Sequence, residues 1–134
     1  MTTEAAAATV LHFFRYLDDQ IYEEIPQLFA DDGIWYRRDQ ALHGPAQVRR
    51  SLIDLPPAMP TVHLVTNLQV ETVTPTEARA VFYVTALRPL ATTSTPPPWP
   101  MDPPLVVALY KAHLVAHGRH WHFKTLQNRP IFRR

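Results

Sequence analysis

The order of the secondary-structure signals along this chain restricts the folds open to it. Helical periodicity dominates roughly the first third, whereas nearly all of the second half has the composition and alternation of β-strands. Helices that precede a run of strands pack on one face of an antiparallel sheet, so this order predicts an α+β fold. With 134 residues the chain is long enough for one domain, which we expect to span residues 1–134.

Three N-terminal segments have helical character. The first carries an apolar stripe at helical spacing, made of Val10, Phe13, Phe14, Leu17 and Ile21. A short second helix is expected from about Tyr22 to Phe29, followed by a turn at 31–33 and a short strand at 34–36. The third is expected to begin at Gly44-Pro45, because the fixed φ of proline suits the first helical position, and to stop at Pro56.

The rest of the chain predicts strands at 61–73, 78–88, 105–117 and 119–126. In the last hairpin, around Gly118, His117 should face His120, Val115 should face His122 and His113 should face Lys124. One face is then core, formed by Ala112, Leu114, Ala116, Trp121 and Phe123. Seven prolines between Pro89 and Pro104 indicate a loop between strands, because proline cannot join a central ladder.

Composition excludes several function classes. The chain has a net charge of +1 with basic and acidic residues interspersed, so it lacks the positive electrostatic potential that attracts nucleic acid. It contains no cysteine, which removes disulfides and thiolate metal sites and agrees with a reducing cytoplasm. No stretch approaches the roughly 20 apolar residues that span a bilayer, and the N-terminus has no signal-peptide pattern. We therefore expect a cytoplasmic protein with no nucleic-acid or membrane partner.

The second face of the last hairpin is rich in histidine: His113, His117, His120 and His122. Imidazoles on one strand face can converge on a metal ion. No acidic residue lies among these positions, and Lys111 and Lys124 flank them, so a solvated strand face or a subunit interface is the preferred interpretation. We expect no metal and no cofactor.

His63 is the main catalytic candidate. It opens the first long strand and, with a four-residue turn after Val73, would pair across the ladder with Arg88. A guanidinium nearby disfavours the charged imidazole, which suits a general base. Strict alternation places His63 away from Leu64, Leu68 and Val70, so it faces a pocket only if that pocket is partly polar or a bulge turns the histidine. The alternative is a buried histidine bonded to backbone.

Other residues are candidates for support and binding. Asp18 follows the first helix and could accept a proton from the His63 ring, or simply cap the helix end. Trp35 and Tyr36 alternate, so one of them faces inward, where a ligand could satisfy a tyrosine hydroxyl. Phe14 from the helical stripe is a further substrate contact, and Trp99 could fold over a pocket mouth unless its loop is only a surface excursion.

Three motifs carry a resemblance to a known family: Phe29-Ala30-Asp31-Asp32-Gly33-Ile34-Trp35, His43-Gly44-Pro45 with Val48-Arg49 and Leu52, and His63-Leu64-Val65-Thr66-Asn67-Leu68-Gln69-Val70. The chain resembles, over residues 5–128, the SnoaL-like branch of the nuclear transport factor 2-like superfamily. That branch includes scytalone dehydratase and the small subunits of ring-hydroxylating dioxygenases. The motifs indicate a fold more than an activity, because one scaffold serves many chemistries.

The resemblance implies a cystatin-like roll, in which a cone-like, curled antiparallel sheet packs against three N-terminal helices, commonly dimeric through the sheet. It places Asp18 and His63 where scytalone dehydratase has an aspartate and its first histidine, with Tyr36 near a tyrosine position. Arg88 or Pro89 stands where a second histidine is expected, and Leu17 where another tyrosine is expected.

Two functions follow. The first is a cofactor-independent lyase, isomerase or cyclase that acts on a hydrophobic aromatic or polyketide-like carbonyl compound. In it His63 would transfer a proton, Asp18 would orient the imidazole, and Arg88 with Tyr36 would hold a substrate oxygen. The second is a non-catalytic protein that binds a small hydrophobic ligand or acts as a dioxygenase-type assembly subunit. Both are compatible with a homodimer.

Overall fold

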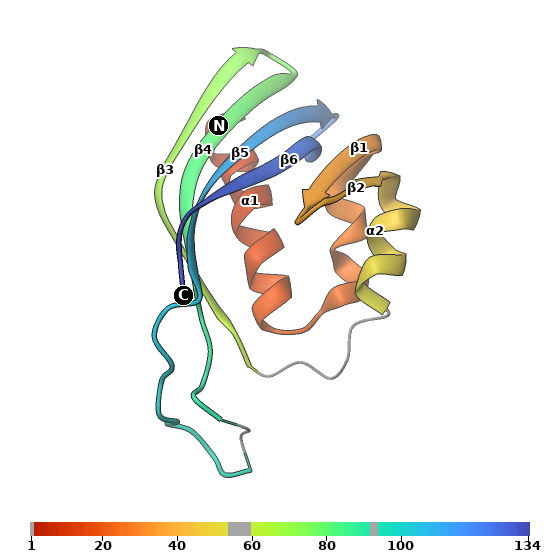
Figure 1. Cartoon of the computed structure of the whole chain (residues 1–134). Helices are drawn as coiled ribbons and strands as arrows, with labels where there is room; N and C mark the ends of the chain where they lie inside the picture. The colour runs from red at the N-terminus through yellow and green to blue at the C-terminus, as the bar shows by residue number, and fades with distance from the viewer. Residues whose placement is uncertain (1, 54–59, 92–93) are drawn as a thin grey trace.

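The computed structural model describes residues 2–53, 60–91 and 94–134. In chain order the elements are α1 (Thr2–Asp18), the 3-10 helices η1 (Tyr22–Glu24) and η2 (Pro26–Leu28), β1 (Phe29–Arg37), β2 (Gln40–His43), α2 (Gly44–Ile53), β3 (Val62–Thr74), β4 (Glu77–Leu87), β5 (Val106–His117) and β6 (His120–Arg133). The predicted α+β class is confirmed (Figure 1). The expected end of the third helix at Pro56 lies outside the described residues.

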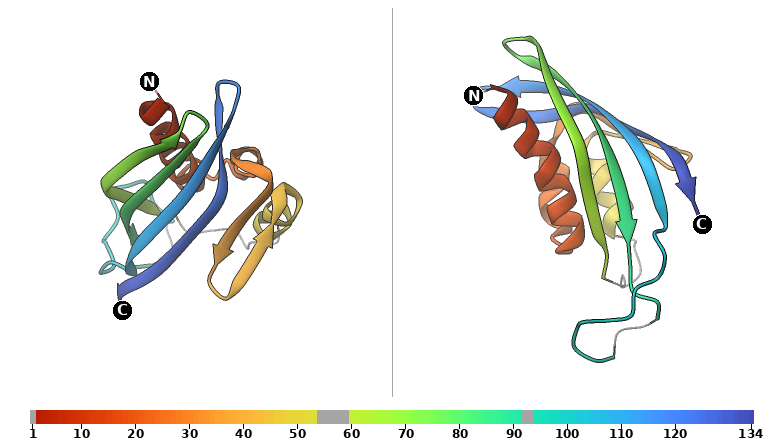
Figure 2. Two further views of the ribbon diagram at one scale, coloured as in Figure 1. Left: turned by 90° about the horizontal axis from the view of Figure 1, so that it is seen from above. Right: turned by 90° about the vertical axis from the view of Figure 1, so that its left-hand side faces the viewer.

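The strands form one curled sheet in the order β2-β1-β6-β5-β4-β3. Its helices lie on one side, with α1 along the inner face of the long strands and α2 beside β1 and β2 (Figures 1 and 2). The sheet is mixed and not wholly antiparallel as predicted, because β1 pairs with β6 in parallel. These strands are distant in sequence, so no tight turn between them sets their relative direction.

The segment around β1 differs most from the sequence prediction. Residues 31–33, expected as a turn, lie inside β1 at a register shift between Phe29 and Ile34. Gly33 permits this path, since a Cβ there would lie 2.4 Å from the carbonyl oxygen of Phe123. The strand β2 was missed, and it pairs with β1 around a two-residue turn in which Arg38 has a φ of 55°. The predicted second helix is two 3-10 turns interrupted before Pro26, which lacks the amide donor a longer helix needs.

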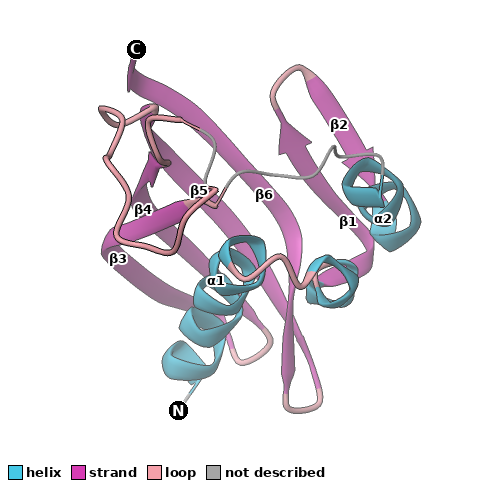
Figure 3. Ribbon diagram, turned by 90° about the horizontal axis from the view of Figure 1, so that it is seen from below, coloured by secondary structure: helices cyan, strands magenta, loops and turns pink. Residues whose placement is uncertain are grey.

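The core joins the stripe of α1 to the inner face of the sheet. Val10 and Phe13 are fully buried, and Phe14 is nearly so. The Phe13 ring meets the rings of Trp35 and Phe123 edge-on, at centroid distances of 5.2 and 5.7 Å. Edge-to-face aromatic pairs add to the stabilisation from buried area. The apolar stripe predicted from helical spacing therefore anchors α1 in the curl of the sheet (Figure 3).

The proline-rich segment extends beyond the end of the sheet as a loop between β4 and β5 (Figure 1). Its base is held by the Leu90 amide, which donates to the Pro100 carbonyl at 2.8 Å, and by a bridge between Pro89 and Met101. The prediction of a loop is confirmed. No helix in the described part of the chain is long and apolar enough to cross a bilayer.

The position of Phe13 leads to a stability prediction. Phe13→Ala should lower the free energy of unfolding by about 3–5 kcal/mol, because the substitution leaves a cavity among packed aromatic rings. Leu11→Ala, on the exposed side of the same helix, should change it by less than about 1 kcal/mol. Urea denaturation followed by circular dichroism measures both, and equal losses would contradict this packing.

Candidate active site

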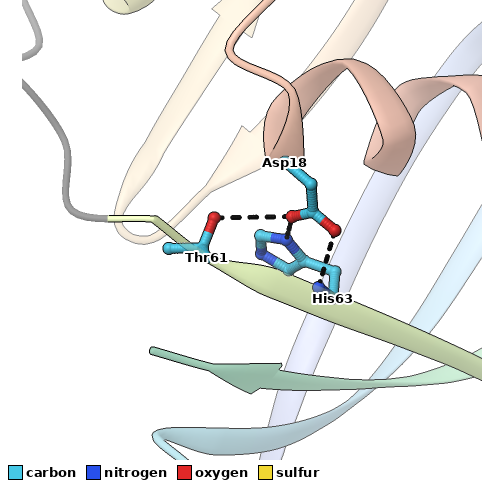
Figure 4. Close-up of polar contacts among 3 residues, drawn as sticks. All are labelled: Asp18, Thr61 and His63. Atoms are coloured by element: carbon cyan, nitrogen blue, oxygen red, sulfur yellow. Dashed lines mark hydrogen bonds and ion pairs between the residues drawn. The ribbon is translucent and has the colours of Figure 1, made fainter. Parts of the chain in front are cut away.

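The structure brings Asp18 and His63 into direct contact (Figure 4). Nδ1 of His63 lies 2.5 Å from Oδ1 of Asp18, and the backbone amide of His63 donates to Oδ2 at 2.8 Å. The hydroxyl of Thr61 donates to Oδ1 at 3.4 Å. The side chains of His63 and Asp18 are only 19% and 15% exposed. The carboxylate thus receives donors on both oxygens and fixes the ring.

This geometry sets the tautomer of the imidazole. An ionised carboxylate only accepts hydrogen bonds, so Nδ1 of His63 carries the proton that it shares with Asp18. In the neutral ring Nε2 then presents a lone pair, as in a histidine that acts as a general base. An acceptor carboxylate at Nδ1 also stabilises the ring once Nε2 has taken up a proton. The pair can therefore remove a proton from a bound molecule and return it.

A negative charge at the position of Asp18 is electrostatically unfavourable for α1. It is the last residue of α1, where the helix dipole disfavours a negative charge by about 0.3–1 kcal/mol. The helix ends there because Gln20 adopts a φ of 57° and the amide of Ile21 bonds back to the carbonyl of Tyr16. The donors of Thr61 and His63 offset the cost, so the acid is held by β3 and not by its own helix.

A bulge in β3 turns His63 inward. The register of β3 against β4 shifts between Thr66 and Gln69, where Asn67 has a φ of 54°, and again between Thr72 and Thr74. Each shift adds a residue to one strand and reverses which side chains face inward. As a result His63 and Val65 share the inner face with Leu68 and Val70, while Leu64 is exposed. Of the two conditions expected for an inward-facing His63, a partly polar pocket or a bulge, the bulge is present.

The same two register shifts place Arg88 away from His63. His63 pairs with Ala86, so the predicted pairing with Arg88 is wrong by two residues. Nε of Arg88 lies 3.8 Å from the buried carboxylate of Asp102, which also binds Arg134. The guanidinium of Arg88 therefore pairs with Asp102 at the base of the proline-rich loop and not with His63. Its expected role beside the imidazole has no support in this geometry.

Phe14 connects the dyad to a residue that the sequence analysis missed. Its ring lies 5.5 Å from the His63 ring and 5.3 Å from the Tyr110 ring, centre to centre. Tyr110 also stacks on Phe82 at 5.3 Å. Burial raises the pKa of Tyr110 to about 12, against a smaller lowering by Arg37, so its hydroxyl stays protonated at neutral pH. Tyr110 continues the alternation of Ala112 and Leu114, and this signal could have identified it.

Trp35 and Tyr36 take opposite sides of β1. Trp35 is 5% exposed within the aromatic core, whereas Tyr36 is 40% exposed. Tyr36 therefore lies on the face opposite to the aromatic core, and Tyr110 supplies the inward phenol instead. Arg37 follows Trp35 by two residues and lies with its Cζ 5.1 Å from the Trp35 ring centre.

Trp99 is not near the dyad. Its indole N–H donates to the Thr95 carbonyl at 2.7 Å within the loop. With Val62 and Arg88 it lines a small apolar pocket of about 220 Å³. Val62 alternates with His63 and is exposed, so this pocket lies on the other side of β3 from the imidazole. A covering role for Trp99 at the dyad has no support here.

The histidine-rich face follows the predicted pairing in part. His117 faces His120 and Val115 faces His122, but His113 faces Thr125 because Lys124 is the extra residue of a bulge. His113 Nε2 lies 3.0 Å from a Glu77 carboxylate oxygen. Burial, with His117 and His120 nearby, lowers the pKa of His122. Within residues 2–53, 60–91 and 94–134, no three histidines or acids are placed to hold a metal ion.

Comparison with known families covers nearly the whole chain. The model of the SnoaL-like domain matches residues 2–127. The chain belongs to the SnoaL-like domain family. No curated protein matches the sequence. The resemblance inferred from the three sequence motifs is thereby confirmed.

Solved structures share the fold of this SnoaL-like protein at low sequence identity. A protein provisionally named scytalone dehydratase from Novosphingobium aromaticivorans DSM 12444 is 21% identical, with a TM-score of 0.77 over 96% of this chain and 83% of that one. The hexachlorocyclohexane dehydrochlorinase LinA-type3 from Novosphingobium barchaimii LL02 is 16% identical, with a TM-score of 0.76 over 99% and 89%. A nuclear transport factor 2-like protein with a cystatin-like fold, from N. aromaticivorans, is 15% identical, with a TM-score of 0.76 over 96% and 80%.

The bulge that orients His63 can be tested by mutation. Asn67→Val should lower the free energy of unfolding by about 1–2 kcal/mol, because a β-branched residue is strained at positive φ. Asn67→Gly should stay close to wild type, since glycine adopts this conformation freely. Urea denaturation measures both, with Thr66→Val at the exposed neighbouring position as the control. Wild-type stability in Asn67→Val would show that the bulge is not maintained by this residue.

The raised pKa of Tyr110 predicts a dependence of stability on alkaline pH. The pKa of Tyr110 is higher in the folded protein than its ordinary value of 10. The protonated phenol therefore stabilises the fold below pH 10, and this contribution to the free energy of unfolding is lost as pH rises toward 12. Between pH 9 and pH 11 the free energy of unfolding of wild type should fall by about 1 kcal/mol more than that of Tyr110→Phe. Urea titrations at the two pH values measure the difference, and parallel losses would contradict the burial of this phenol.

Proposed function

We propose that this SnoaL-like protein is a cofactor-independent enzyme in which His63 transfers a proton to or from a small hydrophobic molecule. The observation that carries the proposal is the 2.5 Å contact between His63 Nδ1 and Asp18 Oδ1, which leaves Nε2 as the acceptor. A ring oriented by an acid and mostly shielded from solvent is an arrangement that general-base catalysis uses. Asp18 orients the ring and stabilises its protonated form.

The substrate class we propose is an aromatic or polyketide-like carbonyl compound. Phe14, Phe82 and Val65 give the surroundings of His63 and Tyr110 an apolar character suited to such a molecule. A carbonyl acidifies the neighbouring C–H bond, so one base is sufficient for isomerisation, cyclisation or elimination. The names of two similar structures, a dehydratase and a dehydrochlorinase, both describe eliminations that remove a proton and a leaving group.

Assembly is a second candidate function, and one observation favours it. The outer face of β3 and β4 exposes apolar side chains, each between 39% and 51% exposed, at Val62, Leu64, Val81 and Tyr83. Contiguous exposed apolar side chains often mark protein contacts. We propose that this face pairs two copies of the chain through the sheet. A dioxygenase-type assembly subunit would use the same face and would not need the Asp18–His63 pair.

The enzymatic proposal is tested by exchange of carbon-bound protons. Wild-type protein in D2O, incubated with a panel of aryl ketones and fused-ring aromatic ketones, should incorporate deuterium beside the carbonyl of at least one compound, as followed by NMR. His63→Gln should slow this exchange by at least about 100-fold, because the base is removed, and Asp18→Asn by at least about tenfold. Melting temperatures of all variants separate loss of chemistry from loss of fold.

His113 provides a matched control for this experiment. It also pairs with a carboxylate, that of Glu77 at 3.0 Å, but on the histidine-rich face of the last hairpin. His113→Gln should therefore keep the wild-type exchange rate. Exchange that persists in a folded His63→Gln, or that falls equally in His113→Gln, would overturn the assignment of His63 as the base.

A further inference from the structure

We propose that Arg37, Tyr110 and Asn128 form an anchor for a carboxylate on the ligand, so that the preferred substrate is an aromatic carbonyl compound that also carries a carboxylate. This inference rests on the proposed function for what happens at His63, but the anchor itself can be tested by binding alone. None of these residues was a candidate from the sequence. The argument uses strand register, burial and the chemistry of the three side chains.

Strand register places the three residues in one row on the inner face of the sheet. In the parallel pair, Trp35 lies beside Leu126, and continuing this register by two residues along each strand brings Arg37 level with Asn128. Asn128 pairs with Tyr110 on β5, and Tyr110 pairs with Phe82 on β4. The Asn128 amide, 3.4 Å from the Tyr36 carbonyl, supports this proximity to the end of β1.

All three side chains face the interior. Trp35 and Leu126 are buried in the core, and alternation puts Arg37 and Asn128 on the same side as these neighbours. Each of the three is partly buried. A guanidinium, a phenol and an amide are all hydrogen-bond donors, so together they form a donor-rich site at an otherwise aromatic surface.

The guanidinium is the decisive group. Burial lowers the pKa of Arg37, the phenols of Tyr110 and Tyr22 act against this lowering, and arginine nevertheless remains charged in proteins. Within the described residues, the ion pairs involve His63, Arg88, His113, Lys124 and Arg134, and none includes Arg37. A partly desolvated cation is costly unless an anion compensates it. The planar fork of arginine fits a carboxylate through two parallel hydrogen bonds.

Phe14 connects the anchor to the proton-transfer group. Its ring contacts the His63 ring on one side and the Tyr110 ring on another. A ligand that reaches both groups would place its carboxylate at Arg37 and its reacting carbon toward Nε2 of His63, with the buried Phe14 ring between the two. The alternative is a purely structural role, in which Arg37 only covers the Trp35 ring by a cation–π contact.

The test compares 2-naphthoate with 2-naphthamide, a neutral ligand of the same shape, by isothermal titration calorimetry. Wild type should bind the carboxylate at least about tenfold more tightly than the amide, since only the carboxylate forms charge-assisted hydrogen bonds with the guanidinium. Arg37→Gln should remove this preference by weakening naphthoate binding, with naphthamide binding unchanged. Tyr110→Phe should weaken naphthoate binding a fewfold.

Two further variants make the result decisive. Arg129→Gln removes a neighbouring exposed arginine from the outer side of β6 and should keep the wild-type preference. Arg37→Lys keeps the charge without the fork and should bind naphthoate more weakly than wild type, with a reduced preference; it also serves if Arg37→Gln fails to fold. Equal binding of the two ligands by wild type, binding of neither, or an unchanged preference in a folded Arg37 variant would overturn the anchor.

The same measurements separate this inference from the proposed function. His63→Gln should lose proton exchange but still prefer naphthoate, because the anchor does not depend on the base. Equal binding of naphthoate and naphthamide by wild type would contradict the anchor alone, whereas persistent exchange in a folded His63→Gln would contradict the proton-transfer role alone.

Discussion

The carboxylate of Asp18 joins two segments that are more than forty residues apart in sequence. It stands at the end of α1 and receives the amide and ring of His63 together with the hydroxyl of Thr61 at the start of β3. Hydrogen bonds to a charged acceptor in a partly dry site are strong and directional. They determine how far α1 reaches along the inner face of the sheet, and they also orient the imidazole. One interaction therefore serves both the fold and the proposed chemistry.

The bulges of β3 decide what this interaction can be used for. A regular strand would have placed His63 on the outer face with Asn67 and Gln69, away from Phe14. The shift at Asn67 instead brings His63 and Val65 inward, and the two shifts together place Ala86, and not Arg88, opposite the histidine. The displaced Arg88 holds the buried acid at the base of the proline-rich loop. Local irregularity in one strand thus separates His63 from the guanidinium of Arg88.

Two adjacent residues of α1 face different parts of the interior, one aromatic and the other more polar. Phe13 faces the rings of Phe29, Trp35 and Phe123, whereas Phe14, one residue later, faces His63 and Tyr110. The polar row of Arg37, Asn128 and Tyr110 lies on three neighbouring strands of the same face. Since one helix covers both regions, the residues that stabilise the fold directly border those proposed to act on the ligand. Structures that are only 16% and 21% identical share this fold, so very different sequences can form it.

Local sequence patterns were sufficient to predict which faces of several helices and strands are buried. Helical spacing identified the buried face of α1, and the alternation around Gly118 identified the core side of the last hairpin with the pairs His117–His120 and Val115–His122. The adjacency of Asp18 and His63 was also expected, although mainly from the resemblance to a family. Tyr110 and Arg37 could have been found by continuing the alternation from Ala112 and from Trp35. These properties depend on periodicity over a few residues, which the chain encodes directly.

Other properties were decided only in three dimensions. The parallel pairing of β1 with β6, the inward turn of His63 and the removal of Arg88 to Asp102 each depend on contacts between segments far apart in sequence. A bulge shifts every later position on its strand by one residue, and no local propensity marks it beyond an asparagine at positive φ. Sequence by itself therefore determined which elements form and which faces are apolar. The tertiary structure decided which side chains meet, because the register between distant strands is set by packing of the whole sheet.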